Sequence, residues 1–174
     1  MKEDRDILLG DADPFWSNIV IDKEKKGELN KLEIMKRITF FSDLTKKELS
    51  KVSPILYELK FQEEEYLFEM NQPGAALFII TRGVVSITIP GNNQKAIVLA
   101  SLKPGDFVGE LALLDDSPRS ASAQAAQYSE ALAFFRADFS KLIKNEPVIG
   151  GKILKRLANV IGERLKAKIG RAHV

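Results

Sequence analysis

The chain has 174 residues, of which 45% are hydrophobic, and this is enough for one domain with its own core. It contains no cysteine, which excludes disulfides, thiolate catalysis and cysteine-ligated metals. Its charged start, MKEDRD, precedes an apolar run too short for a signal peptide, and no run approaches the roughly 18 residues of a membrane span. We therefore expect a cytoplasmic protein.

Charge is distributed unevenly, although the formal net charge is only +2. Residues 141–171 hold nine Lys and Arg against two Glu, a net of +7 that leaves −5 for the rest of the chain. Such an excess can indicate an acidic partner, nucleic acid or a membrane surface, but it is also common on the solvent face of a C-terminal helix. We expect the solvent face, without direct nucleic-acid or membrane binding.

The first predicted elements are helices. In residues 1–37, an N-terminal extension, apolar residues recur at every third position and predict one helix with an apolar stripe. The stripe consists of Leu29, Leu32, Met35 and Ile38. Asp43 or Thr45 would cap a second helix, and Glu48 is placed to complete a capping box from Thr45. We expect this helix to end near Val52.

The middle of the chain has the pattern of a β-domain. Residues 57–135 are short strand-like runs separated by Gly, Pro and Asn turns. The runs are YELKF, EYLFEM, ALFIITRG, VVSITI, KAIVLASL, SASAQA and EALAFF. Short strands at this spacing predict a sandwich or barrel, so residues 38–137 are predicted to form a β-barrel with an opening helix.

Two helices are predicted after the barrel, over residues 138–168. Asp138 would cap the first, and Pro147 would open the second. An apolar stripe follows the second helix at Ile153, Leu154, Leu157, Val160, Ile161 and Leu165. It would pack on its own barrel, on a bound ligand, or on the same helix of a second subunit.

The last six residues need a separate interpretation. Residues 169–174, IGRAHV, match the translation of a common sequencing adapter in one reading frame. We treat them as an adapter-derived tail and give no role to His173, the one histidine. On this interpretation the natural chain continues past Lys168.

The segment that carries chemistry is GDFVGELALLDDSPRSASA, residues 105–123. A glycine turn leads to Gly109 and a short helix, ELALL, and the turn DDSP returns the chain to a strand. Free backbone amides at the helix start favour an anion, and glycine lets a ligand approach the backbone closely. The pattern predicts a phosphate site.

Two charged side chains fit this interpretation. Arg119 lies between an apolar helix and an alternating strand, so its guanidinium is predicted to point inward and to need an anion, such as a phosphodiester. Glu110 is an acceptor-only carboxylate that suits a sugar hydroxyl. The alternative is structural: these two side chains pair with each other, or with Asp115 or Asp116, and fix the loop.

The segment GDFVGELALLDDSPRSASAQA resembles the phosphate-binding cassette of the cyclic-nucleotide-binding domain family. This family includes catabolite activator proteins, regulatory subunits of cyclic-AMP-dependent protein kinase, and cyclic-nucleotide-gated channels. FFSDLTKKEL is similar to its opening helix and PGAALFIITRGVVSI to its barrel hairpin, so the resemblance extends over residues 38–165. It departs at Val108, where the family usually has an aromatic residue. The resemblance implies a mainly β fold with flanking helices, a double-stranded β-helix (jelly-roll) barrel.

The resemblance also implies a ligand, cyclic AMP (cAMP) or cyclic GMP (cGMP), with the base left open. Glu110 would bind the ribose 2′-hydroxyl and Arg119 the cyclic phosphate. Three backbone positions and two hydroxyls would complete the site: Gly109, Leu111, Ala112, Ser120 and Ser122. The helices of residues 138–168 would move to cover the base, with Leu157, Val160 or Ile161 in contact with it.

No catalytic residue and no metal site is expected from the sequence, so we do not expect an enzyme. Three functions remain open. The chain is a cyclic nucleotide sensor that signals to a protein partner, a fragment of a catabolite-activator-like transcription regulator without its DNA-binding domain, or an interaction module that no longer binds ligand. A homodimer through the last helix and a monomer are both compatible with the stripe.

Overall fold

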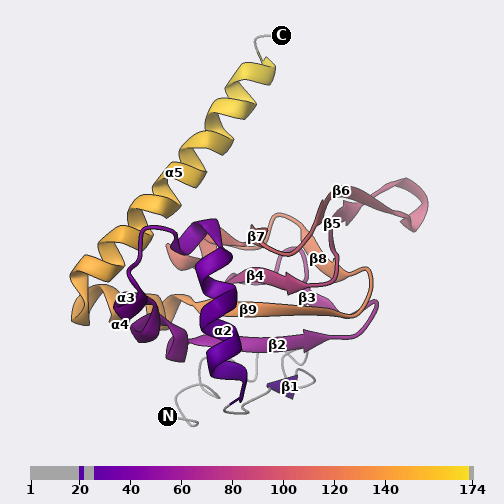
Figure 1. Ribbon diagram of the computed structural model, residues 1–174. Helices are drawn as coiled ribbons and strands as arrows, with labels where there is room; N and C mark the ends of the chain where they lie inside the picture. The colour runs from indigo at the N-terminus through magenta and orange to yellow at the C-terminus, as the bar shows by residue number, and fades with distance from the viewer. Residues whose placement is uncertain (1–19, 22–25, 173–174) are drawn as a thin grey trace.

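Two antiparallel sheets and a set of flanking helices make up the fold (Figure 1). The computed structural model describes residues 20–21 and 26–172. One sheet has five strands in the order β1-β2-β9-β4-β7, and the other has four in the order β3-β8-β5-β6. The predicted mainly β fold with flanking helices is confirmed, with the strands paired in two sheets rather than in one closed ring.

The predicted strands are present, with two additions. The five-stranded sheet contains β1 (Val20–Ile21), β2 (Leu56–Phe61), β9 (Ser129–Phe135), β4 (Ala76–Arg82) and β7 (Phe107–Val108). The four-stranded sheet contains β3 (Tyr66–Phe68), β8 (Ser122–Ala125), β5 (Val85–Pro90) and β6 (Ala96–Leu102). The additions, β1 and β7, are two residues long each, too short for an alternation pattern to indicate.

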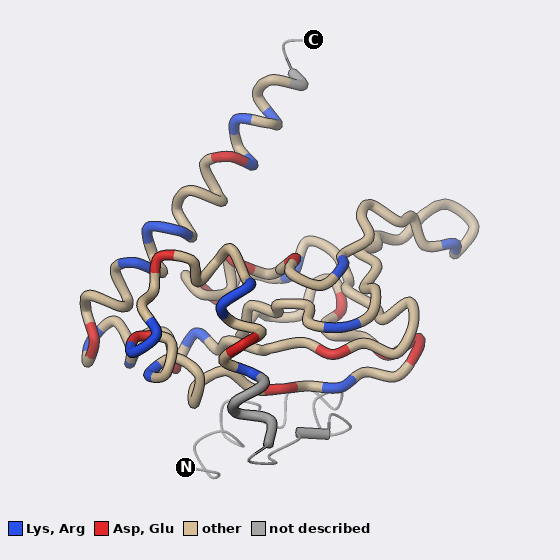
Figure 2. The backbone as a smooth tube through the Cα atoms, in the orientation of Figure 1, with Lys and Arg blue, Asp and Glu red and all other residues tan. Residues whose placement is uncertain are grey.

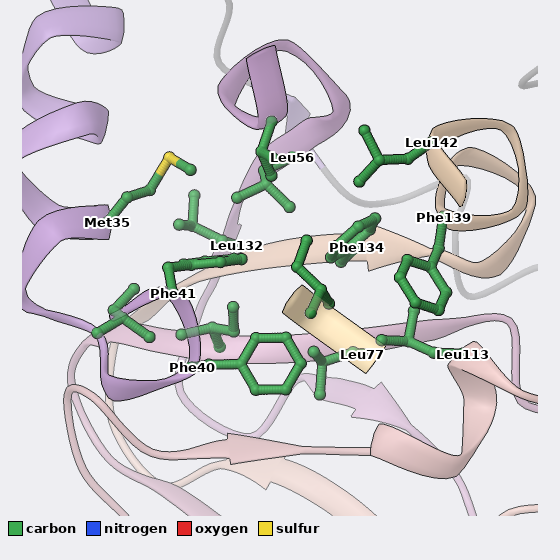
Figure 3. Packing of buried hydrophobic residues seen from close by; sticks show 14 of the residues in the cluster. Met35, Phe40, Phe41, Leu56, Leu77, Leu113, Leu132, Phe134, Phe139 and Leu142 are labelled. Carbon is green, nitrogen blue, oxygen red and sulfur yellow. The ribbon is translucent and has the colours of Figure 1, made fainter. Parts of the chain in front are cut away.

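The five-stranded sheet separates two apolar clusters, because successive side chains of a strand point to opposite faces. On β4, Phe78 and Ile80 point to the inner cluster between the sheets, whereas Leu77 and Ile79 point to the outer cluster under the helices. The outer cluster joins the sheet to every long helix, and Figure 3 shows part of it, with Phe134 and Phe139 in edge-to-face contact. The inner cluster ends beside the candidate site.

The helices before the barrel follow the sequence prediction. Helix α2 (Lys26–Arg37) buries Met35 completely, and η2 (Thr39–Phe41), a 3-10 turn, follows it. Helix α3 (Lys46–Val52) begins with the predicted capping box, in which Thr45 accepts from the backbone of Glu48 and the Glu48 carboxylate accepts from the backbone of Thr45. A further 3-10 turn, η3 (Ser53–Ile55), leads into β2.

Helix α4 (Arg136–Asn145) corrects the expected boundary. Its N-cap is Phe135, which makes no side-chain capping bond, so Asp138 lies in the first turn and is not the cap. The helix starts two residues early because β9 runs directly into it, and the Arg136 amide is held by the Ala75 carbonyl at 2.9 Å. The predicted boundary at residue 138 therefore falls inside a helix.

Helix α5 (Pro147–Ala172) opens at the predicted proline and extends beyond the body of the protein (Figure 1). The residues of its predicted apolar stripe differ in burial. Ile153 and Leu157 are buried in the outer cluster, whereas Leu154 and Leu165 are exposed. No described helix is long and apolar enough to cross a membrane.

The β5–β6 hairpin also projects from the body and carries little charge (Figure 2). Lys95, in the turn that includes η4 (Asn92–Gln94), is its one charged residue. Ile97, Val98 and Leu99 on β6 are exposed, and the base of the hairpin forms one wall of the candidate site.

Candidate functional site

A pocket of about 410 Å³ lies between the β5–β6 hairpin, the segment from β7 to β8, and α5. This volume lies within the range of small-molecule sites. The pocket contains the segment that the sequence singled out, and its lining includes six of the seven predicted site residues: Gly109, Glu110, Leu111, Ala112, Arg119 and Ser120. The remaining lining is largely apolar.

Gly109 shapes the floor of the pocket. Its backbone is left-handed, with φ 84° and ψ 28°, a conformation that glycine adopts without strain. A Cβ at this position would collide with Nη1 of Arg119 and would come within 3.1 Å of the Ala76 carbonyl oxygen. The next residues form η5 (Glu110–Leu113), a single 3-10 turn in place of the predicted short helix, and the Ala112 amide donates to the Gly109 carbonyl at 3.0 Å.

Arg119 is buried, with 8% of its surface exposed, as the sequence predicted. Its backbone is held on both sides, because its amide donates to Gln72 O and its carbonyl accepts from Asn71 N, each at 2.8 Å. Its guanidinium donates through Nη2 to Ala76 O at 2.7 Å and lies 4.0 Å above the ring centre of Phe68. Nε is buried and has no hydrogen-bond partner among the residues that the structure describes.

The charge of Arg119 is poorly compensated. Burial, and after it the positive charge of Arg136, lowers the pKa of Arg119 to about 10, while Glu110 acts in the opposite direction. The guanidinium is therefore still protonated at neutral pH, at a cost in free energy. An anion in the pocket would offset this cost.

Glu110 does not pair with Arg119. Its carboxylate, on a side chain that is largely buried, accepts from Nη1 of Arg164 on α5, 54 residues away in sequence. Asp115 instead accepts from the Ser117 amide at 3.0 Å, and the pKa of Asp115 is lowered by hydrogen bonding from the Ser117 side chain and, after it, from this amide. The structural alternative from the sequence, in which Arg119 forms an ion pair with Glu110, Asp115 or Asp116, is wrong for the described residues.

Arg136 supports the site from behind and was not predicted from the sequence. Its Nη1 donates to three backbone carbonyls, Gly74 O at 2.7 Å, Ala112 O at 3.1 Å and Asp115 O at 2.5 Å. These bonds join the loop before β4 to η5 and to the turn that follows it. No pattern of side chains in the sequence could indicate a partner set made only of carbonyl groups.

Other predicted residues lie elsewhere. Ser122 is not in the lining, and its hydroxyl accepts from the Met70 amide at 2.9 Å. Leu157 is fully buried in the outer cluster and Ile161 packs against it, so the part of α5 that lines the pocket is Arg164 and not these apolar residues. Among the described residues, no three His, Cys, Asp or Glu side chains gather where they could hold a metal ion.

The site can be compared with known proteins. The family model of the cyclic nucleotide-binding domain matches residues 58–146, which include the whole pocket segment. The chain belongs to the cyclic nucleotide-binding domain family. The sequence-based resemblance is thereby confirmed.

Curated relatives of this domain include a kinase regulatory subunit and a cyclic AMP receptor protein. The chain is 28% identical over 130 residues to a cAMP-dependent protein kinase regulatory subunit of Dictyostelium discoideum, over 73% of this chain and 40% of the relative. It is 30% identical over 129 residues to the Cyclic AMP receptor protein of Thermus thermophilus, over 74% of this chain and 60% of the relative. It therefore spans only about half the length of such relatives.

Solved structures give the same fold. The Thermus thermophilus catabolite activator protein superposes with a TM-score of 0.68 at 28% identity, over 77% of this chain and 61% of that one. A cyclic nucleotide-binding domain from Methylobacillus flagellatus has a TM-score of 0.76 at 24% identity, over 92% and 90% of the two chains. At that identity the second likeness shows the fold alone.

Proposed function

We propose that this domain binds cAMP or cGMP in the pocket and works as a cytoplasmic sensor rather than as an enzyme. The observation that carries the proposal is the buried guanidinium of Arg119, which borders the pocket and has no carboxylate partner among the described residues. A cyclic phosphate is a monoanion with two free oxygens that match a guanidinium fork. A cyclic phosphate would therefore supply the negative charge that compensates the buried guanidinium of Arg119.

The rest of the pocket suits the other parts of such a ligand. Gly109 allows the phosphate to approach the backbone, and the Glu110 carboxylate can accept a bond from the ribose 2′-hydroxyl. Ser120 offers a hydroxyl near the phosphate. Ile87 and Leu99 form an apolar wall from β5 and β6 for the base.

Signalling would pass through α5, because this helix reaches from the outer cluster to the pocket, through Leu157 and Arg164 respectively. Movement of α5 would change the surface offered to a protein partner. The exposed Leu154 and Leu165 make a second copy of this helix one such partner.

The test is a calorimetric titration of the protein with cAMP and with cGMP. We expect saturable binding that weakens about 30-fold or more, about 2 kcal/mol, in Arg119→Ala, because a desolvated charge pair is lost. The control is Arg82→Ala, which removes an exposed arginine from β4. Failure of the folded wild-type protein to bind either nucleotide would contradict the proposal and favour an interaction module without ligand.

A second candidate is the effector domain of a transcription regulator. The observation in its favour is the 30% identity to the Cyclic AMP receptor protein of Thermus thermophilus, of which the chain spans 60%. The gene region that follows the codon for Lys168 can test it. A helix-turn-helix pattern within about 60 further residues would support this candidate. The absence of such a pattern would favour the sensor instead.

A further inference from the structure

Within the described part of the chain, one side chain anchors the outer part of α5 to the rest of the protein. Residues 163–170 are all exposed, and within this range Arg164 is the residue with an ion pair or ring contact to another element. Its guanidinium pairs with Glu110 and lies 5.6 Å from the ring centre of Phe107 on β7. Lys166, by contrast, pairs with Glu163 on the same helix.

This anchor occupies the carboxylate that a ribose hydroxyl would need. The Glu110 side chain is 9% exposed and the Arg164 side chain 52% exposed, so the pair leaves little of the Glu110 side chain open to a ligand. The exposed arginine can return to water at small cost, whereas the glutamate is fixed at the start of η5. The pair therefore opens by movement of Arg164.

We propose that Arg164 competes within the molecule for Glu110 and so sets the affinity of the site for ligands with a ribose 2′-hydroxyl. This inference rests on the proposed function. A bound 2′-hydroxyl displaces Arg164 from Glu110, and the outer part of α5 loses its anchor. Recognition of the sugar and release of the helix are then one event at one carboxylate.

The first experiment measures dissociation constants for cAMP or cGMP, whichever binds the wild-type protein more tightly. Arg164→Ala should bind about fivefold more tightly, because the ligand no longer has to break the ion pair. The control, Lys168→Ala, removes a positive charge one turn further along the same face and should bind no more tightly than wild type. Tighter binding cannot come from lost attraction for the phosphate, since removal of a positive charge would weaken it.

A ligand without the 2′-hydroxyl tests whether the gain in affinity comes from competition for Glu110. The 2′-deoxy form of the same cyclic nucleotide has no 2′-hydroxyl to donate to Glu110, so the ion pair between Arg164 and Glu110 can stay in place. Its affinity should be equal for wild type and Arg164→Ala. A fivefold gain for both ligands, or weaker binding of either ligand by Arg164→Ala, would overturn the inference, the latter by making Arg164 a ligand contact.

A second readout does not depend on the ligand. Amide hydrogen exchange of residues 163–170 should be faster in Arg164→Ala and in Glu110→Gln than in Lys168→Ala. Unchanged exchange would overturn the inference while nucleotide binding, and with it the proposed function, still stood. If the folded wild type and the variants bind no cyclic nucleotide, both fail, and the exchange data then describe a structural ion pair.

Discussion

The inner and outer halves of α5 have the same amphipathic pattern but different surroundings. Between Pro147 and Leu157, one face of the helix enters the outer cluster through Ile149, Ile153 and Leu157. Lys152 and Arg156 form ion pairs with Glu48 and Asp43, respectively. From residue 163 to residue 170 the side chains are exposed, and Arg164 forms the contact with the body. Periodicity thus indicates which face of a helix is apolar, but not how far along the helix that face finds a partner.

The largest difference should come from one leucine in each half. Leu157 is 0% exposed and Leu165 is 57% exposed. Leu157→Ala should lower the free energy of unfolding by about 3 kcal/mol, through lost burial and a residual cavity. Leu165→Ala should change it by no more than about 0.5 kcal/mol. Urea denaturation measures both, and equal effects would mean that the outer half is covered in solution.

A smaller effect, dependent on pH, should come from Glu48, which ties α3 to the inner half. Its hydrogen bond from Lys152, and after it the bond from the Thr45 amide, lowers the pKa of Glu48 from its usual 4.5. A lowered folded-state pKa adds stability above pH 4.5 that is lost as the pH falls through the folded-state value. Glu48→Gln should therefore lower the melting temperature at pH 7, and the gap to wild type should narrow below pH 4.5.

The matched control for this change is Glu63→Gln, which removes one negative charge from an exposed position. It should leave the melting temperature at pH 7 almost unchanged. A gap between wild type and Glu48→Gln that stayed constant down to pH 3 would show that Glu48 acts through its shape and not through its charge.

The smallest effect is expected from shortening the outer half. A protein that ends at Leu165 keeps Arg164 and the whole outer cluster, so its free energy of unfolding should equal that of the full chain within about 0.5 kcal/mol. A loss of more than 1 kcal/mol would mean that residues 166–174 stabilise the fold, for example by association of two copies. Denaturation at two protein concentrations separates these cases.

The parts that the sequence could predict rest on neighbours in the chain. The two residues of the capping box, Thr45 and Glu48, are three positions apart, and the strands show their alternation locally. Glu110 and Arg119 were found because the segment that holds them is continuous. Arg164 was missed because its partner is 54 residues away, and Arg136 because its partners are backbone carbonyls.

The Asp138 cap shows how a local rule can mislead. Aspartate is a common N-cap, and the rule would hold for a helix that follows a loop. Here β9 passes into α4 without a loop, and the position of the helix start is set by Arg136, whose amide and guanidinium both bond to the loop before β4. Tertiary bonds decided a boundary that the sequence placed by local preference.

Gly109 has a consequence at the level of the gene. Every missense change of a glycine codon adds a Cβ. At this position a Cβ would collide with the Arg119 guanidinium, and it would also strain the left-handed backbone. Because the residue borders a pocket and lies outside both apolar clusters, such a change should damage the site more than the fold. Variants at this codon should therefore give a protein that folds normally but has an altered pocket.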